Sequence, residues 1–328
     1  MEDLLQKRNE IDRQIRQLYQ ERMKLNEALE SETGADGSLR EVLTAAIEHT
    51  EKSFPEYASV ACQGVAGAYS EAAAKKLFKY PGILYFKNFD NIFGAIENGL
   101  CEYGILPIEN STVGSVNKTY DLMREHRCYI IRSIRLKIDH DLMVRPGTKA
   151  EDVREIYSHQ QAFDQSERNL RKLFPSAKLT MCANTAEAAR RVAGSDTDDK
   201  AAICSSECAA LYGLETIVDD IQDNNHNYTR FICFAKKPMI FAGADKTSFL
   251  AVLANKPGSL YEVLKKFNDV GYNLIKLESR PIPDTEFQFM FYFDFEASVY
   301  HNKFIDIMCE LEEACEMMEY LGSYNEKI

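Results

Sequence analysis

The sequence predicts an α/β protein in which a two-lobed region is followed by a smaller βαββαβ sandwich. Between residues 57 and 237, short apolar runs each end in a loop of small and polar residues, after which a helical stretch begins. This alternation predicts a mainly parallel sheet. A late apolar run over 228–235 can return to an earlier sheet, which would divide the region into two lobes. After residue 241 the order of elements changes to βαββαβ, which is typical of a ferredoxin-like sandwich.

Residues 1–55 predict a helical segment that precedes these sheets. The stretch 4–30 contains neither Gly nor Pro, and a second helix is expected over 39–53, before Pro55. Because two short helices do not easily form a core of their own, we expect them to pair across a dimer or to pack on the body. The apolar stripe of the first helix, with its seven-residue repeat, consists of Leu4, Ile11, Ile15, Leu18, Leu25 and Leu29.

Five loops that follow predicted strands are the strongest indication of a binding cleft. In an open α/β sheet, ligands bind where the strand ends meet the helix starts. The free N–H groups and the dipole at a helix start favour carboxylates and phosphates. The pattern therefore predicts a cleft for a small polyanion. The loops lie at 66–70, 107–114, 158–161, 184–185 and 205–206.

The elements expected in the C-terminal sandwich place it over 246–328, joined to the preceding region by the stretch 241–244. The predicted division is thus 1–55, 57–237 and 246–328. The expected strands cover 248–254, 273–279, 287–295 and 318–321, and the expected helices cover 258–270 and 300–315.

The composition excludes several classes of function. The 328 residues carry a formal net charge of −12, which disfavours nonspecific binding of nucleic acid. No apolar run approaches the ~20 residues of a membrane span, and the charged start is unlike a secretory signal. The nine cysteines include no Cys-x-x-Cys pair, and no cluster has metal-site spacing. We expect a cytoplasmic protein with reduced thiols and no metal.

Five sequence strings in the middle region together resemble prephenate dehydratase. They are Gly64–Ser70 (GVAGAYS), Pro107–Ser115 (PIENSTVGS), Asp139–Leu142 (DHDL), Ser158-His159 with Gln165, and Asn227–Phe231 (NYTRF). The order of all five is that of the family. One departure is Gln160, which stands where the family usually has proline after the Ser-His pair. The resemblance implies a catalytic domain over 57–237 with the two-lobed architecture of periplasmic binding proteins.

The reaction implied by the resemblance converts prephenate to phenylpyruvate with loss of CO2 and of the ring hydroxyl. Aromatisation drives this reaction, so no metal or redox cofactor is expected. Hydroxide departure needs a positioned proton donor, and the resemblance implies Thr229 for this role. Asn110 and Gln165 are expected to orient the substrate or the leaving oxygen. Taken alone, Asn110 also fits a turn and Thr229 also fits an ordinary strand position.

Further polar groups are candidates for binding the substrate carboxylates. Each hydroxyl among them is equally suited to capping a helix N-terminus, and the two roles can coexist. His140 and His159 are expected to make structural hydrogen bonds, and Glu109 fits either a cleft or a helix start. The candidates are Ser111, Thr112, Ser158, Thr185 and the amides around Ala68 and Ser70.

The C-terminal segment resembles the ACT-type regulatory domain. Its strings, Asn255–Leu260 (NKPGSL) and Glu278–Pro281 (ESRP), imply two loops that bind phenylalanine between subunits. L-Phenylalanine would then be an allosteric inhibitor of a homodimer or homotetramer. The helix start at Gly258 offers amides for the amino acid's carboxylate. The residues implied are Asn255, Gly258, Ser259, Leu260, Glu278, Ser279, Arg280 and Pro281.

The first segment resembles only the opening helix of a chorismate mutase domain. Leu5 stands where that helix has its first arginine, and Arg22 alone cannot surround a dianion with cations. Mutase activity is therefore doubtful. The alternatives kept open are arogenate dehydratase, a bifunctional mutase and dehydratase, and a solute-binding module with the same two-lobed architecture.

Overall fold

The computed structural model describes residues 38–282 and 288–328, and before them the helical positions 7, 10, 13, 14, 17, 18, 21 and 24. Most of the predicted N-terminal stripe, namely Leu4, Ile11, Ile15, Leu25 and Leu29, lies outside the described residues. Leu18 is described, and 64% of its surface is exposed. Among the residues that the structure covers, no helix has both the length and the hydrophobicity of a membrane span.

The first lobe is built on a seven-stranded sheet with the order β16-β5-β11-β3-β1-β2, in which β4 pairs with β3. Strands β2 and β3 run parallel to β1, whereas β11 runs antiparallel to β3 and β5. The predicted return of the chain at 228–235 is thus confirmed. The strands are β1 (Tyr57–Gln63), β2 (Tyr80–Phe86), β3 (Tyr103–Asn110), β4 (Gly114–Ser115), β5 (Tyr129–Lys137), β11 (Tyr228–Ala235) and β16 (Glu326–Lys327), and the helices are α3 (Tyr69–Leu77), α4 (Phe89–Glu97) and α5 (Asn117–Glu125).

The second lobe contains a five-stranded sheet with the order β10-β6-β9-β7-β8. Strands β8 and β9 are parallel to β7, and β6 is antiparallel to β9 and β10. Both sheets are therefore mixed rather than mainly parallel, because β11 in the first lobe and β6 in the second run antiparallel to the strands on either side of them. The elements are β6 (Asp141–Val144), η1 (Ala150–Asp152), β7 (Glu155–Ser158), α6 (Gln160–Asp164), α7 (Glu167–Leu173), β8 (Lys178–Met181), α8 (Thr185–Ala193), β9 (Lys200–Cys204), α9 (Ser206–Tyr212) and β10 (Glu215–Val218).

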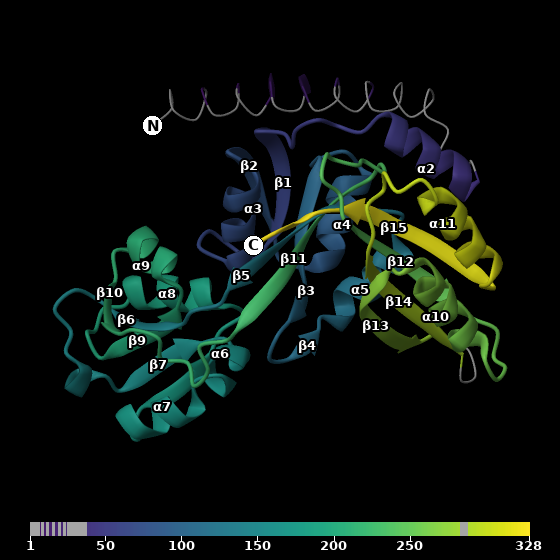
Figure 1. The fold of residues 1–328 in the computed structure, drawn as a ribbon. Coiled ribbons are helices and arrows are strands. Elements are labelled where there is room, and N and C mark those ends of the chain that lie inside the picture. The colour runs from purple at the N-terminus through teal and green to yellow at the C-terminus, as the bar shows by residue number, and fades with distance from the viewer. Residues whose placement is uncertain are drawn as a thin grey trace.

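The C-terminal sheet has the strand order β13-β14-β12-β15, and all its pairs are antiparallel. This order confirms the predicted βαββαβ sandwich. The second lobe and the sandwich lie at opposite ends of the molecule, with the first lobe between them (Figure 1). The elements are β12 (Lys246–Val252), α10 (Ser259–Val270), β13 (Asn273–Pro281), β14 (Phe289–Glu296), α11 (Phe304–Glu313) and β15 (Met317–Tyr324).

Helix α2 (Leu39–Glu48) packs on the body rather than standing apart. It starts at a capping box formed by Ser38 and Glu41. Arg40 bonds Asp306 of α11 at 2.8 Å, and Leu43 joins the core of the sandwich. The helix ends before the predicted residue 53 because the backbone of Glu51 pairs instead with residues 240 and 242.

One face of the sandwich's sheet shares a hydrophobic core with the first lobe, while its other face packs in a separate cluster with α10 and α11. Leu250 and Tyr292 of its sheet lie in one buried cluster with Phe93 and Ile130 of the first lobe. At Gly322 an added Cβ would lie 2.1 Å from the carbonyl oxygen of Ile130, and its φ of +136° also favours glycine. The last strand, β16, continues into the first lobe's sheet beside β5.

Candidate active site

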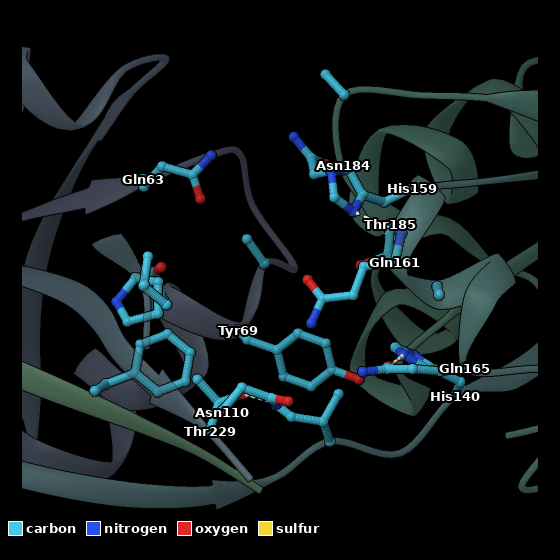
Figure 2. A pocket seen from close by; sticks show the side chains of 18 of the residues that line it. Gln63, Tyr69, Asn110, His140, His159, Gln161, Gln165, Asn184, Thr185 and Thr229 are labelled. Atoms are coloured by element: carbon cyan, nitrogen blue, oxygen red, sulfur yellow. Dashed lines mark hydrogen bonds between the residues drawn. The ribbon is translucent and has the colours of Figure 1, made fainter. Parts of the chain in front are cut away.

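A cavity of about 320 Å³ lies between the two lobes. Figure 2 shows its polar side chains facing one another, with Gln63, Asn110 and Thr229 on one side and His159, Gln161 and Asn184 on the other. The connection between the lobes contributes Ile138 and His140. The lining residues are Gln63, Ala68, Tyr69, Ser70, Phe89, Pro107, Asn110, Val116, Ile138, His140, His159, Gln161, Ala162, Gln165, Ala183, Asn184, Thr185, Thr229 and Phe231.

The starts of three helices meet at this cavity, as the loop pattern predicts. Residues 68–70 begin α3, His159 precedes α6, and residues 184–185 begin α8. Ala68 provides no side-chain cap for α3, which leaves its first amides open to a ligand. The predicted loop at 107–114 also contributes Pro107 and Asn110, whereas the loop at 205–206 does not line the cavity. The cavity therefore offers helix-start amides to an anion.

The side chains of the cavity supply hydrogen bonds but no fixed charge. Among the described residues that line it there is no Asp, Glu, Lys or Arg. Burial lowers the pKa of His140, so its imidazole is neutral at neutral pH. A dianionic ligand would accordingly be held by neutral donors and helix dipoles.

Asn110 and Thr229 are directly opposed on the paired strands β3 and β11. Asn110 Nδ2 donates to Thr229 Oγ1 at 2.9 Å and to Asn227 Oδ1 at 2.8 Å. The other end of the amide is fixed as well, since Asn110 Oδ1 accepts from the backbone N–H groups of residues 112 and 113 at 3.0 Å. Because Thr229 Oγ1 accepts this bond, its own O–H remains available to donate to a ligand.

Gln165 is held in one orientation by two donors. Its Oε1 accepts from Asn227 Nδ2 at 3.0 Å and lies 3.1 Å from His140 Nε2. Because Oε1 can only accept, His140 carries its proton on Nε2. The Nε2 of Gln165 is buried and has no protein partner among the described residues. This amide group is therefore a free donor within the cavity.

The structure does not bring all predicted substrate-binding residues to the cavity. Thr185, Ala68 and Ser70 line it. Ser158 is fully buried, and its hydroxyl donates to the carbonyl oxygen of Ile203 at 2.8 Å. At the end of β7, this side chain lies within the second lobe and does not line the cavity. The prediction that Ser158 contacts the substrate is therefore wrong.

Ser111 and Thr112 also lie outside the cavity lining, and both are exposed. The Ser111 hydroxyl bonds the backbone of residues 226 and 228, which ties the end of β3 to the start of β11. Thr112 contributes through its backbone N–H, which fixes Asn110. Both residues thus support the site rather than face a ligand.

Sequence reasoning assigned no role to Asn227 or Tyr69. Asn227 joins Asn110 to Gln165, and it precedes Thr229 by two residues, the spacing that places side chains on one side of a strand. The Tyr69 hydroxyl donates to the Asp139 carbonyl oxygen at 2.5 Å, and burial raises the pKa of this phenol well above its ordinary value. It thereby links α3 to the connection between the lobes.

The contacts of His140, His159 and Glu109 bear on what the sequence predicts for each of them. His140 makes the expected structural hydrogen bond, to Gln165, and His159 accepts from the N–H of Gln161 at 3.3 Å. Glu109 faces neither the cavity nor a helix start. Its carboxylate instead bonds Lys276 of β13 at 2.8 Å.

A second cavity, of about 220 Å³, lies on the sandwich. Asn255, Ser259 and Leu260 line it together with Phe289 and Glu316. Gly258 caps α10 with a φ of +90° but is not part of the lining.

The second predicted group of regulatory residues does not reach this cavity. Glu278 accepts from Ser115 at 2.9 Å, and Arg280 bonds Asp121 at 2.8 Å, so both side chains contact the first lobe. Ser279 and Pro281, which alternate with them along β13, are exposed. One chain alone therefore does not assemble the two predicted loops into one site.

The fold and the cavity define a two-lobed α/β protein with a polar cavity between its lobes, at which three helices start. A family model for prephenate dehydratase matches residues 60–239, more than half of the chain. The chain belongs to the prephenate dehydratase family, and it is accordingly a dehydratase, a carbon–oxygen lyase.

Of three similar proteins, two are named as dehydratases and one is named for another activity. Arogenate dehydratase 2 of Petunia hybrida is 38% identical over 282 residues, which cover 81% of this chain and 71% of that protein. A prephenate dehydratase from Arthrobacter aurescens, solved in complex with L-Phe, has a TM-score of 0.74 at 29% identity and covers 81% of this chain and 89% of its own. GqqA, described as a quorum quenching acylase, has a TM-score of 0.73 at 28% identity and covers 81% and 97%.

Proposed function

We propose that this chain converts prephenate to phenylpyruvate and that Thr229, Asn110 and Gln165 carry the reaction. The observation that supports it best is the fixed direction of their hydrogen bonds. Asn110 donates to Thr229, which leaves the threonine O–H free, and Asn227 with His140 leaves the Gln165 amide N–H free. The cavity thus presents oriented donors where a leaving hydroxyl requires them.

In the proposed reaction the carbon–carbon bond to the ring carboxylate breaks, and its electron pair enters the ring as CO2 leaves. The ring hydroxyl departs as water with the proton that Thr229 donates, and solvent restores that proton. A threonine hydroxyl is a weak acid, so preorganisation by Asn110 contributes more than the acidity of Thr229. Aromatisation of the ring provides the driving force.

The two substrate carboxylates are proposed to lie at the starts of α3 and α8. The amides around Ala68 and Ser70 begin the first of these helices, and Thr185 begins the second. Each helix is nine residues long and directs its positive dipole end at the cavity. This arrangement fits a dianion without a cationic side chain.

Prephenate is preferred over arogenate in this proposal. The two differ in that arogenate carries an ammonium group where prephenate has a keto oxygen. The described lining offers no carboxylate to pair with an ammonium, whereas free N–H donors suit a keto oxygen. Arogenate is retained as the alternative substrate, because relatives such as arogenate dehydratase 2 of Petunia hybrida are named for it.

Acyl hydrolysis, the activity in the description of GqqA, is not favoured by the cavity. A threonine nucleophile needs a neighbouring base. In this cavity Thr229 accepts a hydrogen bond from the Asn110 amide, which is not a base, and His140 is hydrogen-bonded to Gln165 rather than to Thr229.

L-Phenylalanine is proposed as the inhibitor, bound at the sandwich cavity in a homodimer or homotetramer. The strings NKPGSL and ESRP, the cavity that contains Asn255 and Leu260, and the L-Phe complex of a relative support this proposal. Since Glu278 to Pro281 do not reach the cavity within one chain, a second copy would supply the remaining contacts. The cytoplasm stays the predicted location.

The test is turnover by the purified protein with prephenate, arogenate or chorismate as sole substrate. We expect phenylpyruvate from prephenate and none from chorismate, because Arg22 alone cannot form a mutase site. Phenylpyruvate from chorismate would show an active mutase site. Saturable binding of prephenate without product would instead identify a binding module.

A further inference from the structure

The strand pair that carries the proposed catalytic residues has a second, occupied face. Asn110 and Thr229 face the cavity, and the neighbouring residues Glu109 and Arg230 face the C-terminal sheet. The two pairs are also in register, because Thr229 is opposite Asn110 and Arg230 is opposite Glu109. Successive side chains of a strand point to opposite sides, so contacts on one face fix the position of the other.

Arg230 forms a buried ion pair with the sandwich. Its Nη2 lies 2.5 Å from Asp294 Oδ2 on β14, and the two side chains are 8% and 6% exposed. Asp294 is held in turn by Ser248, whose hydroxyl donates to its other oxygen at 2.6 Å. Burial opposes the charge of Arg230, but the Asp294 carboxylate raises the pKa of this guanidinium well above its ordinary value. The guanidinium of Arg230 is therefore charged, and its position is fixed from the sandwich side by Asp294 and Ser248.

Glu109 is bound to the sandwich in the same way. Lys276 of β13 bonds Glu109 at 2.8 Å and Ser115 at 2.9 Å, and Ser115 donates to Glu278 at 2.9 Å. Arg230 Nε also lies 3.5 Å from Glu109, which joins the two ion pairs into one network. The network thus spans β3, β11, β13 and β14.

We propose that Glu109 and Arg230 are positioning residues, through which Lys276 and Asp294 of the C-terminal sheet hold Asn110 against Thr229. We call these four charged residues the clamp. This inference rests on the proposed function, since it concerns the geometry of the proposed catalytic pair. A shift of β13 or β14 would move the clamp and alter the 2.9 Å contact between Asn110 and Thr229. The clamp is thus the route by which a ligand on the sandwich changes turnover.

Two double variants remove the clamp without leaving a lone buried charge. Glu109→Gln with Lys276→Met removes one ion pair, and Arg230→Met with Asp294→Leu removes the other. The readouts are kcat and KM for prephenate, the phenylalanine concentration that gives half inhibition, and the thermal unfolding midpoint. The matched control is Lys118→Met, which breaks the exposed pair with Asp90 on the same lobe.

We expect kcat to fall about 10- to 100-fold in each double variant, with KM within about threefold, because misplacement of the catalytic pair affects the reaction rather than binding. Inhibition by phenylalanine should weaken at least tenfold, and the Lys118 control should match the wild type. A folded double variant with wild-type kcat and inhibition would overturn the inference. If the double variant at Arg230 and Asp294 does not fold, the one at Glu109 and Lys276, where the carboxylate is partly exposed, decides by the same criteria. A wild-type protein that makes no phenylpyruvate would instead refute the proposed function.

Discussion

The two cavities of this protein differ in how completely one chain assembles them. In the cavity between the lobes, Asn110, Gln165 and Thr229 converge from separate elements onto one hydrogen-bonded network. In the sandwich cavity, only Asn255, Ser259 and Leu260 of the predicted regulatory residues are present.

The difference shows why similar motif signals lead to different outcomes. The lobes are two parts of one chain, so their connection at 138–140 and 219–227 brings their motif residues together. On the sandwich, Glu278 and Arg280 instead bind the first lobe. The cavity between the lobes is therefore set by intrachain packing, whereas the proposed regulatory site needs contacts that this chain alone does not bring to the sandwich cavity.

The largest expected effect comes from Thr229→Ala. Loss of the proton donor should lower kcat about 1000-fold, within the range for general acid catalysis. Binding of prephenate, measured by equilibrium dialysis, should change little because the helix starts remain. Thr229→Ser keeps a hydroxyl and should retain most of the rate. A full rate in Thr229→Ala would exclude the catalytic role.

Asn227→Asp tests whether the direction of the Gln165 amide matters. An aspartate at 227 still accepts from Asn110 but repels Gln165 Oε1, so Gln165 should rotate and lose its free N–H. We expect kcat to fall about tenfold or more, since one oriented donor is lost. Asn225→Asp adds the same charge to the exposed return segment and serves as the control. Equal rates in both variants would show that the amide direction has no role.

Asn255→Ala tests whether phenylalanine binds at the sandwich cavity. Removal of this lining side chain should raise the phenylalanine concentration for half inhibition about tenfold, because a polar contact to the amino acid is lost. Calorimetric titration with phenylalanine measures the same loss directly. Asn268→Ala, at the far end of α10, should leave both values unchanged. Undiminished binding in Asn255→Ala would place the inhibitor elsewhere.

Glu319→Gln gives the smallest expected effect and concerns the strand β15. Burial raises the pKa of Glu319 to about 6, and the nearby Arg127 and Arg124 only partly oppose the shift. Because the folded-state pKa is raised, the contribution of Glu319 to the free energy of unfolding is most favourable below its ordinary pKa of 4.5. This contribution is lost as the pH rises through about 6. The variant should therefore melt a few degrees higher than the wild type at pH 8 and equally near pH 4. Glu313→Gln, an exposed carboxylate, should show no such difference.

Much of the fold and part of the site follow from local patterns. Alternating apolar runs and helix starts predict the elements of both lobes, and the βαββαβ order predicts the sandwich. The presence of residues 68–70 and Thr185 at the cavity was predictable, because a helix start carries its free N–H groups wherever it is placed. Asn110, Gln165 and Thr229 were recognisable from family strings.

The partners of individual side chains were not predictable in this way. Ser158 carries a hydroxyl at the end of a strand, where a ligand contact is expected. Its hydroxyl nevertheless donates to the carbonyl oxygen of Ile203, 45 residues away. Asn227 joins Asn110 across 117 residues, and Glu109 pairs with Lys276 across 167. Such contacts depend on which faces pack together.

The sequence by itself determined the succession of strands and helices, the anion-receptive loops and the motif residues, because these depend on neighbours along the chain. Only the tertiary structure decided that the sandwich shares a core with the first lobe and that Glu109 and Arg230 face the sandwich. It also decided that Glu278 and Arg280 contact the first lobe and do not line the sandwich cavity. The physical reason is that apolar burial drives the docking of the two sheets without specifying direction. The charged side chains at the contact between the sheets then form ion pairs with the oppositely charged side chains that the docking places next to them.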